Sequence, residues 1–184
     1  MKYFIESLLF RIPISLFSRL KCVVYKAIGM KMGEKNRFES GKIRRAAQIE
    51  IGSNNTFSSI YKLWPEDSAS KDIRISIGSF NYFNKNVMID SCGKIEIGNY
   101  NMFGPDVYIT DSNHTFGPDI SPQKAPMRRG TVKIGNHCWI GAKAIILKDV
   151  ELGDHCVVAA GAVVTKSFLN GSVIGGVPAK IIKE

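Results

Sequence analysis

A chain of 184 residues, 45% hydrophobic and 22% charged, has the composition of one ordinary globular domain and is too apolar for a disordered protein. The net charge of +9 is concentrated at one end: residues 1–45 hold eleven Lys or Arg against three Asp or Glu, which gives +8, and residues 46–184 hold fourteen against thirteen, which gives +1. Four cysteines without a C-x-x-C spacing argue against a zinc ribbon and a redox motif.

Residues 1–31 predict an amphipathic helical segment, broken into two pieces near Pro13 and apolar on one side and basic on the other. Four charged residues interrupt its apolar stretches: Glu6, Arg11, Arg19 and Lys21. The segment is therefore not expected to cross a bilayer, and it lacks the cleavage site of a signal peptide. Two roles remain open, a cap on the following domain or peripheral contact with an anionic membrane surface. The expected location is the cytoplasm, with the inner face of the cytoplasmic membrane as a second option.

A six-residue repeat predicts the fold of residues 32–184. In the stretch from Ile134 to Val164, an aliphatic residue returns at every sixth position: Ile134, Ile140, Ile146, Leu152, Val158 and Val164. A helix requires a period of 3.6 and a plain strand a period of 2, so a period of six favours coils of three short, flat faces. Smaller residues occupy the fifth place of each hexad, and two of them, Cys138 and Cys156, are expected to stack as buried thiols in neighbouring coils. The predicted fold is an all-β solenoid, a parallel β-helix with a short N-terminal helical segment.

Two excursions leave this solenoid. One coil takes 18 residues from Ile134 to Leu152 but 26 from Ile51 to Ile77, so extra residues must loop out. The predicted excursions are residues 63–72 and residues 111–130, "DSNHTFGPDISPQKAPMRRG", both punctuated by Pro. Because long irregular loops in compact domains are usually functional or disordered, residues 111–130 are where we expect the chemistry.

The segments "IGNHCWIGA", "GAVVTK" and "GGVPAKII" resemble the hexapeptide-repeat acyltransferases, in the branch of the maltose and galactoside O-acetyltransferases and the polysaccharide O-acetyltransferases. The similarity spans residues 51–183. It implies a left-handed β-helix, acetyl-CoA as donor, a homotrimer with active sites between subunits, and a sugar hydroxyl as acceptor. The handedness rests on the resemblance alone, because the general crossover rule favours a right-handed turn.

Transfer of an acetyl group to a hydroxyl requires a base, and histidine suits that role at neutral pH. His137 and His155 occupy the same outward hexad place, 18 residues apart, and are expected to belong to the scaffold surface. His114 lies in the larger excursion, and "DSNHTF" matches the Asp-x-x-His site of the family, so we predict His114 as the general base. Asp111 either orients its imidazole or caps the turn. No cysteine is expected at the site, so transfer is expected to be direct.

The resemblance also implies binding residues. Asn84, in a Phe-Asn pair, and Asp90 are expected near the acceptor, although Asp90 lies one residue further from that pair than in the family. For the donor, amides near Gly141, Ala142 and Ala160 are expected to bind pantetheine and stabilise the oxyanion. Trp139 lies beside them, or else simply packs at the coil edge. Four residues are expected at the CoA phosphates: Thr165, Lys166, Lys180 and Lys183.

Other functions compete with sugar O-acetylation. The runner-up is N-acetylation of an amino sugar or nucleotide-linked amino sugar, which the same base would serve. A zinc site like that of the γ-type carbonic anhydrases requires three histidines, but two of the three here share one outward column, so no metal is expected. A non-enzymatic, partner-binding solenoid is a further alternative. It would need neither a long loop nor a histidine where that loop leaves the solenoid. No nucleic-acid partner is expected, because the basic N-terminus has no supporting motif.

Overall fold

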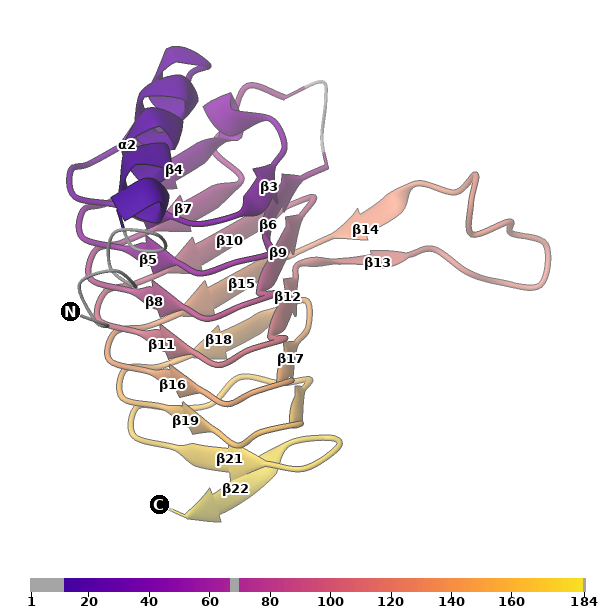
Figure 1. Ribbon diagram of the computed structural model, residues 1–184. Coiled ribbons are helices and arrows are strands. Elements are labelled where there is room, and N and C mark those ends of the chain that lie inside the picture. The colour runs from indigo at the N-terminus through magenta and orange to yellow at the C-terminus, as the bar shows by residue number, and fades with distance from the viewer. Residues whose placement is uncertain (1–11, 67–69, 184) are drawn as a thin grey trace.

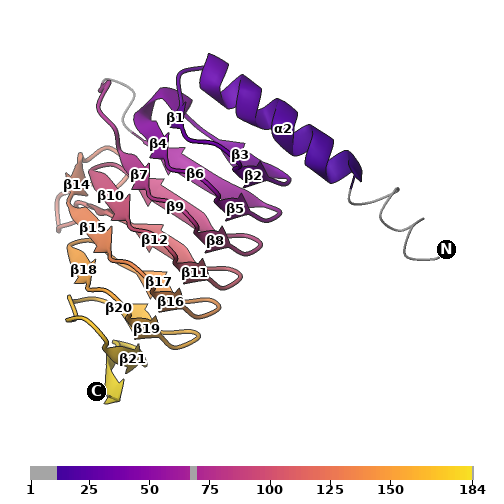
Figure 2. The same cartoon turned by 90° about the vertical axis from the view of Figure 1, so that its left-hand side faces the viewer.

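Three parallel β-sheets form the faces of a triangular coil, and one helix lies across its N-terminal end (Figures 1 and 2). The computed structural model describes residues 12–66 and 70–183. Each coil contributes one short strand to each sheet in turn, and each strand pairs in parallel with the equivalent strand of the next coil. The last pair, β21 with β22, is antiparallel.

The strands are as follows. Sheet 1 contains β1 (Lys31–Met32), β4 (Ile49–Ile51), β7 (Ile75–Ile77), β10 (Lys94–Ile97), β15 (Thr131–Ile134) and β18 (Val150–Leu152). Sheet 2 contains β2 (Arg37–Phe38), β5 (Thr56–Phe57), β8 (Tyr82–Phe83), β11 (Met102–Phe103), β16 (Trp139–Ile140), β19 (Val157–Val158), β21 (Val173–Gly175) and β22 (Lys180–Lys183). Sheet 3 contains β3 (Gly41–Ile43), β6 (Tyr61–Pro65), β9 (Met88–Ser91), β12 (Tyr108–Thr110), β17 (Ile145–Ile146) and β20 (Val163–Val164).

The register follows the six-residue period. In sheet 1, Ile51 pairs with Ile77, Ile77 with Ile97, and Ile97 with Ile134, although the steps between them range from 20 to 37 residues. These side chains are at most 4% exposed, so the aliphatic column forms the core. Cys138 and Cys156 are buried free thiols, as predicted. The hexapeptide pattern and the three parallel sheets confirm the predicted left-handed β-helix.

Side-chain ladders fix the coils in register. Four stacked phenylalanine rings, with centroids 4.5 to 4.8 Å apart, fill the interior against sheet 2: Phe38, Phe57, Phe83 and Phe103. Buried asparagines line the corner between sheets 1 and 2: Asn36, Asn55, Asn81 and Asn101. The Oδ1 of each accepts the backbone N–H of the next residue in the column, and the column ends where Cys138 N–H donates to Asn101 Oδ1 at 2.7 Å. Buried amides that are paired in this way permit only one register.

The N-terminal helix, α2 (Ile12–Ala27), packs on the first coil. Pro13 lies in its first turn, where its missing N–H costs nothing. The first predicted helical piece lies outside the described residues. Ser18 Oγ accepts the Phe38 N–H at 2.8 Å, and the Tyr25 and Tyr61 hydroxyls lie 3.0 Å apart. No helix among the described residues is both long and apolar enough to cross a membrane.

Both excursions differ from their predictions. The first was expected to begin at residue 63, but Leu63 to Pro65 are part of β6, which pairs with β9, because the inward alternation of the coil continues to Pro65. The second is not irregular throughout: β13 (Ser112–His114) and β14 (Met127–Arg129) pair in antiparallel fashion and form an arm that projects from the solenoid (Figure 1). A 3₁₀ helix, η2 (Ala46–Gln48), lies at the same corner in the first coil, between β3 and β4.

Candidate functional site

The arm leaves the corner between sheets 3 and 1, and a cavity of about 590 Å³ lies at its root. We call this cavity the His114 pocket. Its lining residues come from the first excursion, from β9 and the turn after it, and from both strands of the arm: Glu66, Asp90, Cys92, Ser112, His114, Pro126, Met127 and Arg129.

The arm fixes the imidazole of His114. Its Nδ1 lies 3.1 Å from the carbonyl oxygen of Pro122, and a carbonyl oxygen can only accept a hydrogen bond, so Nδ1 carries the proton. Nε2 therefore keeps its lone pair on an exposed ring. Thr115 Oγ1 donates to Pro126 O at 2.7 Å and ties the two sides of the arm together. This arrangement provides an oriented base at the pocket.

Asp111 does not contact His114. Its carboxylate is fully buried and accepts hydrogen bonds from the Ser91 hydroxyl at 2.5 Å and from the N–H groups of Cys92 and Gly93 at 2.8 and 3.0 Å. Burial raises the pKa of Asp111, and these hydrogen bonds act in the opposite direction. Of the two predicted roles, these hydrogen bonds favour the structural one, a cap on the turn after β9, over contact with a substrate or with the imidazole.

Asp90 lines the pocket with one free acceptor. Its Oδ2 accepts the Tyr108 hydroxyl at 3.1 Å, whereas its Oδ1 is buried without a hydrogen-bond partner among the described residues. Burial raises the pKa of Asp90, and nearby Glu66 adds to this. Glu66 itself pairs with Arg44 at 2.8 Å. A ligand hydroxyl or amine is the kind of donor that would satisfy Oδ1.

Cys92 also lines the pocket, contrary to the expectation that no cysteine lies at the site. Its side chain is 6% exposed, and burial raises the pKa of the thiol. The protonated thiol is a poor nucleophile, so the presence of Cys92 does not favour a covalent intermediate.

A second cavity, of about 600 Å³, runs over sheet 2 to its corner with sheet 3. We call it the Trp139 groove. It brings together five of the predicted residues: Asn84, Trp139, Gly141, Ala142 and Ala160. Apolar side chains complete its walls, among them Tyr82, Met102 and Val157. Trp139 is 53% exposed and lines this groove.

The amides of the groove differ in availability. Gly141 N–H donates to Val158 O at 2.8 Å within the coil, so this amide is not free to bind a ligand. The N–H groups of Ala142 and Ala160 donate to no acceptor within the described part of the chain. A Cβ on Gly104 would lie 2.6 Å from Ala142 N, and a Cβ on Gly141 would lie 2.6 Å from Ala160 N. Glycine at these two positions therefore leaves room for a ligand beside each free amide, as a thioester and its pantetheine require.

Gly104 was missed by the sequence reasoning. The available signal was its hexad place, because Gly104 follows the inward Phe103 as Gly141 follows Ile140, and β11 pairs with β16 in that register. The excursion of the arm between them hides this equivalence in the sequence.

Asn84, which was expected near the acceptor, lines the Trp139 groove and does not line the His114 pocket of the same copy. Its Oδ1 accepts the Lys85 N–H at 2.8 Å. The groove and the pocket lie at opposite edges of sheet 3: after the turn at Pro105 and Asp106, the four residue steps from Val107 to Asp111 along β12 span about 13 Å. One copy of the chain therefore does not bring the two cavities together.

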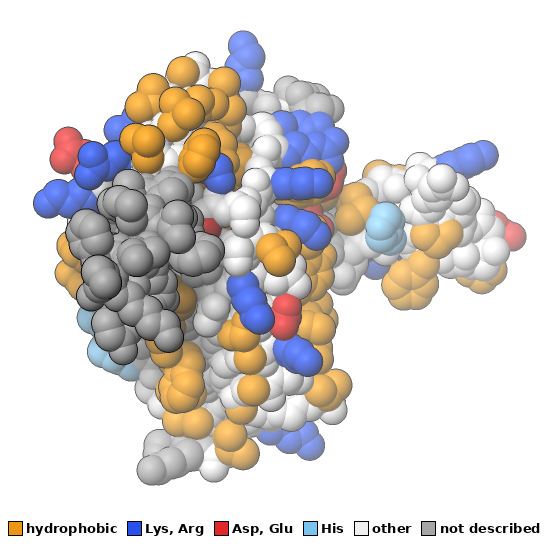
Figure 3. Space-filling view, in the orientation of Figure 1, with side chains coloured by type: hydrophobic (Ala, Val, Ile, Leu, Met, Phe, Trp, Pro, Cys, Tyr) orange, Lys and Arg blue, Asp and Glu red, His pale blue; other side chains and the backbone are white. Residues whose placement is uncertain are grey.

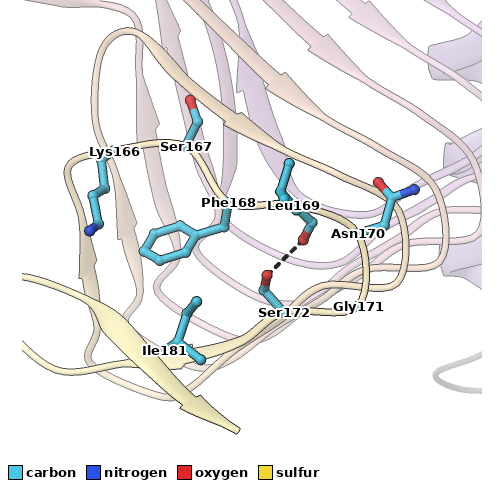
Figure 4. A pocket seen from close by; sticks show the side chains of 8 residues that line it. All are labelled: Lys166, Ser167, Phe168, Leu169, Asn170, Gly171, Ser172 and Ile181. Atoms are coloured by element: carbon cyan, nitrogen blue, oxygen red, sulfur yellow. Dashed lines mark hydrogen bonds between the residues drawn. The ribbon is translucent and has the colours of Figure 1, made fainter. Parts of the chain in front are cut away.

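The predicted phosphate contacts are dispersed at the C-terminal end. Lys166 lines a third cavity, of about 530 Å³, with Phe168 and Ile181 (Figure 4). Its Nζ lies 5.6 Å from the Phe168 ring centroid. Lys180 pairs with Gly175 in β22 and does not line this cavity, and Thr165 is exposed. The side chain of Lys183 lies outside the described residues.

The other two histidines belong to the scaffold surface, as expected. The rings of His137 and His155 stack with centroids 4.9 Å apart, and Tyr100 and Phe80 continue the stack along the outer corner between sheets 1 and 2. In residues 12–66 and 70–183, no group of three or more His, Cys, Asp or Glu side chains is arranged to hold a metal ion.

The comparisons agree with this architecture. The family model of the bacterial transferase hexapeptide (six repeats) matches residues 131–166. The chain is 44% identical over 108 residues to nodulation protein L of Rhizobium meliloti, and this match covers 58% of each chain. It is 32% identical over 111 residues to galactoside O-acetyltransferase of Lactococcus lactis, and this match covers 60% of this chain and 52% of that one. The chain thus spans little more than half the length of these relatives.

Among solved structures, AntD, an N-acyltransferase from Bacillus cereus in complex with dTDP and coenzyme A, is similar in fold. Its TM-score is 0.75 at 23% identity, and the match covers 86% of each chain. The repeat matched in residues 131–166 and the coiled fold are those of the bacterial hexapeptide transferases, and about 60% of this chain is similar in sequence to the relatives named above.

Proposed function

We propose that this protein is an O-acetyltransferase that moves an acetyl group from acetyl-CoA to a hydroxyl of a sugar or of a polysaccharide or lipopolysaccharide precursor. The observation that carries the proposal is the imidazole of His114, oriented by Pro122 O, with a free Nε2 beside a pocket that contains an unpaired carboxylate oxygen of Asp90. The relative named galactoside O-acetyltransferase supports the acceptor class. A CoA thioester donor favours a cytoplasmic reaction.

The transfer is direct. His114 Nε2 removes the proton of the acceptor hydroxyl, and the oxygen attacks the thioester carbonyl carbon. The free N–H of Ala142 stabilises the oxyanion of the tetrahedral intermediate. When the C–S bond breaks, the imidazolium returns its proton to the sulfur of the leaving CoA. The free N–H of Ala160 binds the pantetheine, and the cations of Lys166, Lys180 and Lys183 pair with the CoA phosphates.

The active site forms between copies of the chain. Direct attack requires the reacting atoms to approach to about 3.5 Å, whereas the groove and the pocket of one copy are separated by the width of sheet 3, about 13 Å. The Trp139 groove of one subunit must therefore face the His114 pocket of another. A homotrimer, in which each subunit gives one half of each of three sites, meets this requirement.

The test is release of free CoA thiol from acetyl-CoA with a panel of galactosides, maltose, oligosaccharide repeat units and nucleotide sugars. We expect His114→Gln to lower kcat by about 10² to 10⁴, because it removes the base. His155→Gln is the matched control, since it removes an exposed imidazole of the scaffold, and it should retain activity. If His114→Gln stayed within a few fold of the unmodified enzyme, the proposed role of His114 would be rejected.

N-acetylation of an amino sugar is the second candidate. Glu66 and Asp90 give the pocket two carboxylates, which would also accept an ammonium group, and the fold neighbour AntD is an N-acyltransferase. The same panel separates the two functions when it includes amino sugars, because hydroxylamine cleaves an acetyl ester product but leaves an acetamide intact.

A further inference from the structure

Helix α2 has two different apolar faces. Its inner face packs on the solenoid, where Ser18 caps the Phe38 amide, Cys22 Sγ lies 3.3 Å from Asn36 O, and the Tyr25 ring meets Phe38 edge-on at 5.3 Å. This face accounts for the cap predicted from the sequence. It does not account for the remaining apolar side chains of the helix.

The outer face is exposed and almost entirely apolar. Six large side chains on it are 45 to 67% exposed: Leu16, Phe17, Leu20, Val23, Val24 and Ile28. Their spacing of three to four residues places them along one stripe of the helix, opposite the inner face. Figure 3 shows hydrophobic side chains gathered over α2 at the top of the molecule. A contiguous exposed stripe of this kind marks an interaction surface.

The stripe is bordered by positive charge. Residues 12–27 contain three basic side chains and no acidic one. Arg19 and Lys26 are exposed on one side of the stripe, and Lys21 on the other side donates to Glu39 O. Lys35 and Arg37 of the first coil are exposed nearby. An apolar stripe between cations complements a surface that is apolar inside and negative at its boundary, which is an anionic phospholipid layer.

We propose that the outer face of α2 docks the protein on an anionic membrane surface. The helix both caps the solenoid and binds the membrane, one role for each face. It lies in the membrane interface without spanning the bilayer.

This docking would set the distance between the active site and the membrane surface. α2 covers the first coil, and β12, from which the arm departs, belongs to the fourth coil. Three inter-strand steps of about 4.8 Å put the root of the arm about 14 Å beyond the first coil. The arm extends sideways from the solenoid (Figure 1). A saccharide carried on a membrane lipid would then reach His114 with sugars some distance from its anchor.

The test is flotation of the full chain with vesicles of phosphatidylcholine alone or of phosphatidylcholine mixed with phosphatidylglycerol, without acyl donor or acceptor. We expect binding to the mixed vesicles, weaker binding to the neutral ones, and loss of binding at high salt. Replacing both Arg19 and Lys26 by Gln should lower the partition coefficient on mixed vesicles by roughly ten- to thirtyfold. Lys133→Gln, a cation of sheet 1, is the matched control and should have little effect.

Leu20→Glu tests the apolar stripe. It should abolish binding, whereas Leu169→Glu, which changes an 85% exposed leucine at the other end of the chain, should not. Light scattering on the same proteins without vesicles reports the oligomeric state. The proposal is overturned if the unmodified protein does not float with mixed vesicles, or if Leu20→Glu dissociates the oligomer, because the stripe is then an interface between subunits. Since no substrate is present, either result is independent of the proposed acetyl transfer.

Discussion

The Trp139 groove and the His114 pocket are built by different means. The groove consists of repeat positions, because Trp139, Gly141, Ala142 and Ala160 occupy regular hexad places on sheet 2 and its corner. The pocket combines the regular strand β9, which contributes Asp90, with two interruptions of the repeat, Glu66 and the arm. In the proposed mechanism, the periodic part of the chain therefore provides a fixed surface for the donor, while the interruptions add the base to the site.

The groove can be tested by filling it. In Gly104→Ala, the new methyl group would lie 2.6 Å from Ala142 N, so we expect the oxyanion contact to be blocked and kcat/KM for acetyl-CoA to fall by about 10²-fold or more. Gly98→Ala is the control, because its Cβ would lie 2.7 Å from Gly135 O, an equal crowding away from the groove. Both variants should lose similar thermal stability, and only Gly104→Ala should lose activity. Equal activity losses would argue against a donor site at Ala142.

The separation of groove and pocket can be tested by mixing variants. His114→Gln and Gly104→Ala, each nearly inactive alone, should together regain about a quarter of the activity when co-expressed, because random assembly gives that fraction of sites one intact half from each subunit. CoA release by the purified mixture measures the gain. A mixture no more active than the mean of the two variants would indicate that each copy acts alone.

The structural role of Asp111 at the root of the arm can be tested by measuring the free energy of unfolding. Asp111→Ala leaves the Ser91 hydroxyl and the buried N–H groups of Cys92 and Gly93 without their acceptor, so we expect a loss of about 2 to 4 kcal/mol in the free energy of unfolding. Glu50→Ala, at an exposed position of β4, should cost less than about 1 kcal/mol. Denaturant unfolding measures both. A neutral Asp111→Ala would contradict the structural role assigned to this carboxylate.

The smallest expected effect is a pH-dependent change in thermal stability when Asp90 is replaced. Burial raises its pKa in the folded protein, so the penalty for ionising the carboxylate is complete above the folded pKa, shrinks as the pH falls below it, and vanishes below the ordinary pKa of the unfolded chain. Asp90→Asn should therefore raise Tm slightly at neutral pH, with a gain that vanishes in acid. Asp149 is the control of opposite sign, because the Lys148 contact lowers its pKa, and Asp149→Asn should lower Tm slightly at neutral pH. Thermal melts across pH would show no such contrast if Asp90 were solvated.

The sequence by itself determined the coil. A period of six with small residues at the fifth place admits one arrangement of inward and outward side chains, so the register of Ile51, Ile77, Ile97 and Ile134 could be predicted despite unequal steps. The location of His114 in an excursion pointed to the pocket for a related reason, since a regular solenoid needs no such loop.

Only the tertiary structure decided which groups share a cavity and which are already paired. Gly141 N–H donates to Val158 O, 17 residues further along the chain. Asp111 accepts the N–H of Cys92 in the turn after β9, 19 residues earlier, and Cys92 lines the pocket. Each of these contacts joins two neighbouring coils. The hexad pattern reports whether a side chain faces inward or outward, but hydrogen-bond partners and cavity walls depend on which residue of the next coil lies alongside, and the two excursions shift that relation. The hexad pattern likewise does not report that Asn84 and the His114 pocket lie at opposite edges of sheet 3.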